Sequence, residues 1–310
     1  MNHIFKTSDG KNLRWGWRAA ILILGTILFG IILNAGLMTA LATGYVSQGL
    51  AQGQATEKAT LVSGGFVPQT IMSALQLGFM LWLVRWLITK VEKQDFRWSN
   101  LGLVALERSK HVTLGIVLAL LLSLSTIGVG FFTGTLEYVG NGFELFAPTQ
   151  VITTLLLAAV LALASGFGEE IAYRGYLQSL IAQRYNDMVA VVIVAVLFAF
   201  SHPPTARNPL LYLALIVLVG LLFGMVFVRT GSLWMGITLH TVWNYIQISV
   251  LAVRNSADER FFGSPLFIFD KISGASQSLI EFGVILLGFL FALWITKPTV
   301  KIMKSDFQEK

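Results

Sequence analysis

The chain has 310 residues, of which 55% are hydrophobic and only 12% are charged. Since about one quarter of the residues in a soluble domain are charged, this composition excludes an ordinary soluble protein and indicates a polytopic membrane protein. The absence of cysteine excludes disulfides, thiolate catalysis and cysteine-based zinc sites. The net charge of +6 comes from basic residues that flank apolar segments, so we expect the lipid bilayer, and no nucleic acid, as a partner.

Apolar runs of about 20 residues predict transmembrane helices. We expect an all-α polytopic membrane bundle of about eight transmembrane helices, forming a single transmembrane domain over residues 1–310, with helices at 19–43, 68–89, 112–133, 150–184, 188–202, 210–228, 233–252 and 279–297.

Two of these helices are unusual in length. The fourth is too long to lie wholly in lipid, so its second half, which contains Arg174, Gln178, Gln183 and Arg184, is expected to emerge into water. The fifth is too short to span unaided and ends at Pro203-Pro204, because proline disfavours helix at the preceding residue. Short or broken helices at membrane depth often mark a binding site.

Lysine and arginine are distributed unequally between the two sides of this topology. With these helices, 17 of the 22 basic residues lie on the side that carries both termini, which places the termini in the cytoplasm. The segments 44–67 and 253–278 are then loops on the outer side. The apolar run 19–42 is too long for a signal peptide and is expected to be an uncleaved helix. The absence of cysteine and of organelle signals fits a bacterial inner (plasma) membrane.

Two adjacent carboxylates, Glu169 and Glu170, follow a stretch from Val151 to Ala164 that has no charge. Because a charged side chain at the bilayer centre costs about 2.5–3.5 kcal/mol, ionisable groups there indicate function. On a helix Glu170 and Arg174 share a face and can form an ion pair. Glu169 points about 100° away and is left free to act as a general base. Alternatively, both glutamates brace Arg174 at a wet helix end.

Two histidines lie in other apolar segments. Glu169 precedes the predicted turn at Asn186 by 17 residues and His202 follows it by 16, so in an antiparallel hairpin both lie about 25 Å from the turn. His240 is on the inner half of its helix, with Asn244 one turn further on the same face. A lone membrane histidine usually makes an interhelical hydrogen bond. Two histidines within reach of a carboxylate favour a functional site.

These side chains suit hydrolysis of a peptide bond without a covalent intermediate. A carboxylate takes a proton from water, histidines orient that water, and a histidine or asparagine stabilises the oxyanion. Glu169, His202 and His240 could instead hold a zinc ion that activates the water, and their spacing does not decide between these mechanisms. No cofactor is favoured.

Other intramembrane hydrolase designs fit less well. The sequence lacks the His-Glu-x-x-His motif of zinc metalloproteases, and its six aspartates all fall in predicted loops or tails. Ser165 is the one candidate for a serine nucleophile, and it is better explained as a small helix-packing residue.

Three short motifs resemble, in this order, the signatures of the CPBP family of CAAX-processing and bacteriocin-processing proteases, also called the Abi family: Glu169-Glu170-x-x-x-Arg174, Phe198-x-x-x-His202 and His240-x-x-x-Asn244. The resemblance covers residues 150–250, which we take as the catalytic core. It implies an intramembrane endopeptidase that acts on a membrane-anchored peptide or protein. Eukaryotic members remove three residues from prenylated C-termini, so the resemblance also implies a prenyl-type C-terminal substrate.

The same resemblance assigns roles to single residues. Glu169 would activate the water, His202 would orient it, and His240 with Asn244 would serve the oxyanion. The supporting residues would be Glu170, Arg174 and Phe198.

Two other functions are compatible with the same residues. A proton-coupled transporter could use Glu169, His202 and His240 as a proton relay beside the broken fifth helix. Such a transporter is expected to contain internal repeats, and the sequence has no obvious one. A non-catalytic scaffold or bacteriocin-immunity protein could keep the same fold, because a fold does not guarantee an activity.

Overall fold

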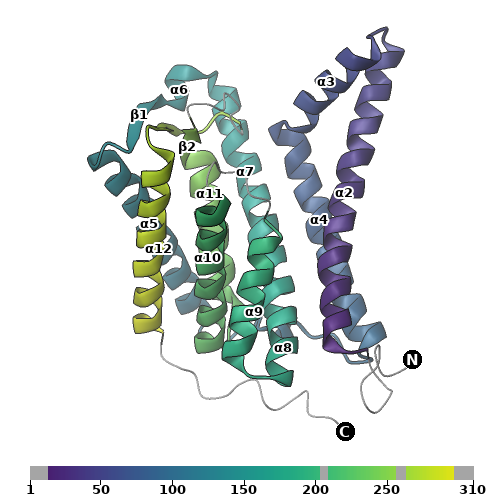
Figure 1. Ribbon diagram of the computed structural model, residues 1–310, viewed down its shortest axis with the longest axis vertical. Coiled ribbons are helices and arrows are strands. Elements are labelled where there is room, and N and C mark those ends of the chain that lie inside the picture. Colours follow the sequence, from purple (N-terminus) through teal and green to yellow (C-terminus); the bar gives the residue numbers. More distant parts are fainter. Residues whose placement is uncertain (1–12, 203–208, 256–262, 297–310) are drawn as a thin grey trace.

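The computed structural model describes residues 13–202, 209–255 and 263–296 as a bundle of long helices (Figure 1). Among these residues, six helices are long and apolar enough to cross a membrane: Trp15–Ser47, Phe66–Val91, Arg108–Phe132, Pro148–Arg184, Leu210–Thr230 and Gly274–Ile295. The chain is therefore an integral membrane protein built mainly from helices, as its composition predicts.

The helices, in chain order, are α2 (Trp15–Ser47), α3 (Gln52–Ser63), α4 (Phe66–Trp86), α5 (Arg108–Phe132), α6 (Gly142–Leu145), α7 (Pro148–Glu169), α8 (Ser179–Arg184), α9 (Asp187–Phe200), α10 (Pro209–Thr230), α11 (Leu233–Tyr245) and α12 (Gly274–Ile295). Three segments are π-helical: η1 (Leu87–Val91), η3 (Glu170–Gln178) and η4 (Ile246–Val250). A 3₁₀ turn, η2, covers Trp98–Leu101.

A helix lies at each of the eight predicted places. Two of the eight, α9 and α11, are not among the six candidate spans, so the count of eight transmembrane helices stays a prediction. The start of α2 and the end of α12 lie at the same end of the bundle, and α3 lies at the opposite end (Figure 1).

The main hydrophobic core surrounds η3. Ile171 and Leu177 of η3 pack there with Leu87, Phe198 and Leu233, which come from η1, α9 and α11, and these five side chains are at most 2% exposed. The segment that carries the paired glutamates is therefore held from several sides.

The all-α bundle is confirmed, and a small three-stranded sheet accompanies its helices. Its strands are β1 (Leu136–Asn141), β2 (Leu251–Asn255) and β3 (Phe267–Lys271), in the order β1-β3-β2, with β1 antiparallel and β2 parallel to β3. The prediction that 253–278 is only a loop is therefore wrong. The pairing of β1 with β3 joins segments far apart in the chain, so local periodicity does not reveal it.

The prediction that residues 44–67 form a loop is also wrong, because most of this segment is helical. The long helix α2 continues to Ser47, and α3 follows at Gln52–Ser63. The small residues Ala55 and Ala59, one turn apart on α3, are fully buried. Helix α3 was not predicted, because its polar sequence contains no long apolar run.

The fourth predicted helix is continuous over α7, η3 and α8, but its second half is not all exposed to water. Arg174 is 0% and Gln178 is 2% exposed, whereas Gln183 and Arg184 are exposed as predicted. Arg174 Nη2 donates to the carbonyl of Gly220 at 3.4 Å, and Gln178 Nε2 donates to that of Gly224 at 3.1 Å. Helix α10 therefore covers this polar face, and two of its carbonyls replace water as partners.

Close packing of α10 on α9 makes Gly220 sensitive to substitution. A Cβ atom there would meet the Cα of Ala195 at 2.8 Å and its Cβ at 2.9 Å. We expect Gly220→Ala to lower the free energy of unfolding by about 1–3 kcal/mol, because Ala195 is part of helix α9 and its backbone must shift. Thermal unfolding in detergent measures this. Gly283→Ala on α12 is the control, since nothing lies within 4 Å of its Cβ position, and an equal loss in both variants would contradict the prediction.

Candidate active site

Local signals fix the starts of the three helices that carry the site. Pro148 begins α7, and proline is favoured at the first helical position. The Asn186 side chain caps α9 by accepting from the Val189 N–H at 2.9 Å. The Ser232 hydroxyl caps α11 by accepting from the Trp234 N–H at 3.3 Å. These caps set where each helix begins and hence the depth of the functional side chains along it.

The adjacent glutamates have different surroundings, as the helical geometry predicts. Glu170 Oε1 and Arg174 Nη1 form an ion pair of 3.0 Å, and neither side chain is more than 1% exposed. Glu169 is the last residue of α7, and its side chain is 24% exposed. The predicted pair is confirmed, and Glu169 is left to face the histidines.

Both histidines turn Nε2 toward Glu169. The Oε2 atom of Glu169 is 3.7 Å from Nε2 of His202 and 4.0 Å from Nε2 of His240. The side chain of His202 is 30% exposed and that of His240 is 9% exposed, so the cluster is open on the Glu169–His202 side. The equal depth predicted for Glu169 and His202 is confirmed. Glu169 Oε2 is itself buried and has no hydrogen-bond partner in the part of the chain described.

The Nδ1 atoms of the two rings are held by acceptors. His202 Nδ1 lies 2.7 Å from the Phe198 carbonyl oxygen, and His240 Nδ1 lies 3.1 Å from Glu170 Oε1. A carbonyl and an ionised carboxylate can only accept, which assigns the proton of each neutral ring to Nδ1. In the neutral form of each ring, the Nε2 atom that points at Glu169 carries no proton and can accept a hydrogen bond.

Two phenylalanines connect the buried arginine to the histidines. The Arg174 guanidinium lies 4.3 Å from the ring centre of Phe198 and 5.2 Å from that of Phe223. The Phe198 ring centre is 4.5 Å from that of His202, and Phe223 stacks on His240 with 4.9 Å between centres. Phe198 was predicted to be a supporting residue. Phe223 was missed, because one phenylalanine in an apolar helix carries no distinguishing signal.

Asn244 lies one turn beyond His240, where the spacing predicts it. Its Nδ2 atom donates to the Ser165 hydroxyl at 3.1 Å. Within the described residues, no hydrogen bond joins Asn244 to Glu169 or to either histidine. The structure therefore brings Glu169, His202 and His240 together and places Asn244 at the edge of that cluster.

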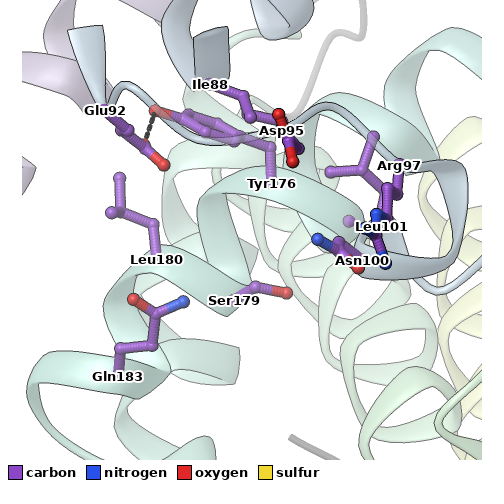
Figure 2. Close-up of a pocket in the computed structure, with 11 residues that line it drawn as sticks. Ile88, Glu92, Asp95, Arg97, Asn100, Leu101, Tyr176, Ser179, Leu180 and Gln183 are labelled. Atoms are coloured by element: carbon purple, nitrogen blue, oxygen red, sulfur yellow. Dashed lines mark hydrogen bonds between the residues drawn. The ribbon is translucent and has the colours of Figure 1, made fainter. Parts of the chain in front are cut away.

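A separate small pocket lies beside Tyr176, about two turns beyond Glu169 on the continuous helix formed by α7 and η3 (Figure 2). Glu92 and Tyr176 line it, and the Tyr176 hydroxyl donates to Glu92 Oε1 at 2.6 Å. Arg18 forms an ion pair of 2.9 Å with the same carboxylate. None of the predicted site residues lines this pocket. The network instead ties α2 and the end of η1 to η3, the segment that carries Glu170.

The fit of the site to a metal ion can be tested on its donors. One carboxylate and two imidazoles are donor types of catalytic zinc sites. However, ligands of tetrahedral zinc lie about 3.3 Å apart, and the two Glu169–histidine separations of 3.7 and 4.0 Å are longer. Among the described residues, no group of three His, Asp or Glu side chains is placed to hold a metal ion. The residues as arranged do not fit zinc, and we derive no step through it.

Comparison with known protein families identifies the part of the chain that carries this cluster. Residues 151–246 match the family model described as Rce1-like, type II CAAX prenyl endopeptidase. No curated protein matches the chain. The matched segment contains the four predicted site residues Glu169, His202, His240 and Asn244. The match over residues 151–246 confirms the resemblance of this segment to CAAX-processing proteases.

Proposed function

We propose that the protein is an intramembrane endopeptidase in which Glu169 activates water to hydrolyse a peptide bond. The observation that carries this proposal is the buried Oε2 atom of Glu169, which faces two imidazole nitrogens and has no hydrogen-bond partner among the described residues. Buried polar atoms almost always have a partner, and exceptions call for an explanation such as a catalytic role. Two hydrogen bonds of about 2.8 Å that meet near a right angle span about 4.0 Å. One water molecule can therefore contact all three side chains.

The reaction then proceeds by proton transfers between this water, Glu169 and the substrate. Glu169 takes a proton from the water while the water oxygen attacks the carbonyl carbon, which gives a tetrahedral oxyanion. His202 orients the water, because its Nε2 accepts the second hydrogen. The C–N bond breaks as Glu169 returns the proton to the amine that leaves. The products are a carboxylic acid and an amine, and Glu169 is ready for another cycle.

His240 and Asn244 stabilise the oxyanion in this mechanism. When both nitrogens of His240 are protonated, Nδ1 donates to Glu170 and Nε2 donates to the oxyanion. The amide of Asn244 supplies a second donor. Glu170 and Arg174 support the site by fixing the ring of His240, as Phe198 does for the ring of His202.

Metal removal distinguishes this mechanism from one based on zinc. We expect a strong chelator to leave the cleavage rate unchanged and the purified protein to contain far less than one zinc per chain. Elemental analysis of the purified protein and rate measurements before and after chelation test both points. Stoichiometric zinc, lost together with activity and restored with it, would show that zinc is the activator.

The substrate side of the proposal is a peptide attached to the membrane by a prenylated C-terminal segment. The family description names prenyl endopeptidases, and the cluster lies among apolar helices with its open side at Glu169 and His202. We further propose that both termini are cytoplasmic and that the protein resides in a bacterial inner membrane. The excess of lysine and arginine in the connections on one side of the predicted topology supports that orientation.

Cleavage of defined peptides by the full chain in liposomes tests the proposal. One peptide ends in a prenylated cysteine followed by three residues, and the control peptide lacks the prenyl group. We expect mass spectrometry to show a released tripeptide from the first peptide only. To include other membrane substrates, peptide termini are compared between membranes with and without the protein. No cleavage in either assay would refute the proposal, and a flux that depends on a pH gradient would favour a transporter.

The stacking of Phe223 on His240 predicts that its loss lowers turnover. We expect Phe223→Leu to reduce kcat about tenfold, because displacement of a catalytic group by a fraction of an ångström is costly. Phe227→Leu is the matched control, since Phe227 lies one turn further on α10, is buried at 3% exposure, and has no ring contact with a histidine in the described structure. Equal kcat values for the two variants would contradict a role for the stack.

A further inference from the structure

Ser165 and Asn244 form a polar contact one turn deeper in the bundle than the Glu169 cluster. Ser165 precedes Glu169 by four residues on α7, and Asn244 follows His240 by four residues on α11. Asn244 Nδ2 donates to Ser165 Oγ at 3.1 Å, and Ser165 Oγ donates to the Ala162 carbonyl at 3.2 Å. The single hydroxyl hydrogen of the serine is thereby used within α7, and its lone pair faces Asn244.

The two helices are in close contact beside this hydrogen bond. A Cβ atom at Gly166 would meet Thr241 Oγ1 at 2.5 Å and its backbone nitrogen at 2.9 Å. Only glycine fits at that position without a shift of α11. The separation between Ser165 and Asn244 is therefore set by packed backbones and not by the reach of flexible side chains.

A hydrogen bond to one N–H group of a planar amide determines the direction in which its second N–H group points. The amide of Asn244 has two N–H groups and one carbonyl oxygen in a single plane. When Ser165 accepts one N–H, the orientation of that plane is set, and so is the direction of the second N–H. A donor already aimed at developing charge stabilises a transition state more than one that must first reorient.

We propose that Ser165 is a positioning residue that aims the Asn244 amide at the oxyanion formed beside Glu169. This inference rests on the proposed endopeptidase function and adds a residue to it. It also explains why a serine lies next to the site without acting as a nucleophile. In the described structure the Ser165 hydroxyl contacts no histidine, and its hydrogen is already donated to the Ala162 carbonyl.

Ser165 variants, measured by peptide cleavage in liposomes, provide the first test. We expect Ser165→Ala and Ser165→Cys to lower kcat about tenfold with KM unchanged, which is the pattern for an interaction made only in the transition state. Ser165→Thr keeps the hydroxyl and is expected to restore most of kcat. Ser123→Ala on α5 is the matched control, because it removes a buried hydroxyl that has no hydrogen-bond partner in the described residues. Full activity of both Ser165→Ala and Ser165→Cys would refute the positioning role.

A double-substitution cycle tests whether Ser165 acts through Asn244. We expect Asn244→Ala to lower kcat about 100-fold, and the added change Ser165→Ala to cause no further loss. If Ser165→Ala lowers kcat by the same factor with and without Asn244, the serine acts independently and the inference is wrong. A wild-type protein that cleaves nothing overturns the proposed function and this inference together. Active Ser165→Ala beside inactive Glu169→Gln overturns the inference alone.

Discussion

Glu169→Gln is expected to lower kcat for peptide cleavage by a factor of about 10²–10⁴, the range that general acid–base catalysis contributes. Glutamine keeps the size and shape of the side chain but cannot accept the proton of the attacking water. The fold should remain intact, because Oε2 of Glu169 has no hydrogen-bond partner among the described residues and the side chain is 24% exposed. The measurement is the cleavage rate in liposomes at equal amounts of folded protein.

Two further variants make this result specific to Glu169. Glu169→Asp keeps the carboxylate but withdraws it by one methylene, so we expect an intermediate loss that reflects misplacement of the base. Glu107→Gln removes an exposed carboxylate just before α5 and should leave kcat unchanged. If Glu169→Gln is as active as wild type, water is activated by some other group, and the proposed mechanism is wrong.

The second large effect concerns stability, at the buried pair of Glu170 and Arg174. We expect Arg174→Met to lower the free energy of unfolding by about 3–5 kcal/mol, because it leaves a buried carboxylate without its cation. The change also removes the cation that lies between the rings of Phe198 and Phe223. Unfolding of the detergent-solubilised protein measures the loss.

Removal of both charges separates the cost of an unpaired charge from the cost of lost packing. The double variant Glu170→Gln with Arg174→Met leaves no uncompensated ion, so it should be more stable than Arg174→Met alone. It should still cleave poorly, because neutral glutamine is a weaker partner than carboxylate for Nδ1 of His240. A double variant that is destabilised by the sum of the two single changes would show that the ion pair does not determine stability at this position.

The parts of the site that depend on helix geometry could be predicted from the sequence. Glu170 and Arg174 are four residues apart on one helix, so their pairing follows from the helical repeat. Glu169 and His202 are nearly equidistant from Asn186, so an antiparallel hairpin brings them to one depth. Both predictions need only a regular helix and one turn, and both are confirmed.

The features that the sequence did not reveal depend on tertiary contacts. Arg174 was expected in water because charged residues are usually solvated, yet Gly220 and two aromatic rings enclose it. The π-helical segment Glu170–Gln178 has no marker in its composition. Such wide turns occur mostly as single turns within α-helices, frequently at functional sites, and are recognised from hydrogen bonding. Strand β3 lies between β2, which is nearby in the chain, and β1, which is far away in the chain.

Glu170 and Arg174 belong to one helix, so their ion pair can form without any other segment. During insertion into the bilayer, an isolated arginine or glutamate at the centre of a helix costs about 2.5–3.5 kcal/mol. The internal pair neutralises Glu170 and Arg174 before α10 and α11 have been synthesised, so Glu169 is the one charge at that level without a partner in its own helix. Gly220 and His240 then contact an arginine and a glutamate that already neutralise each other. The polar centre of the protein is therefore compatible with stepwise insertion, one helix after another, from N- to C-terminus.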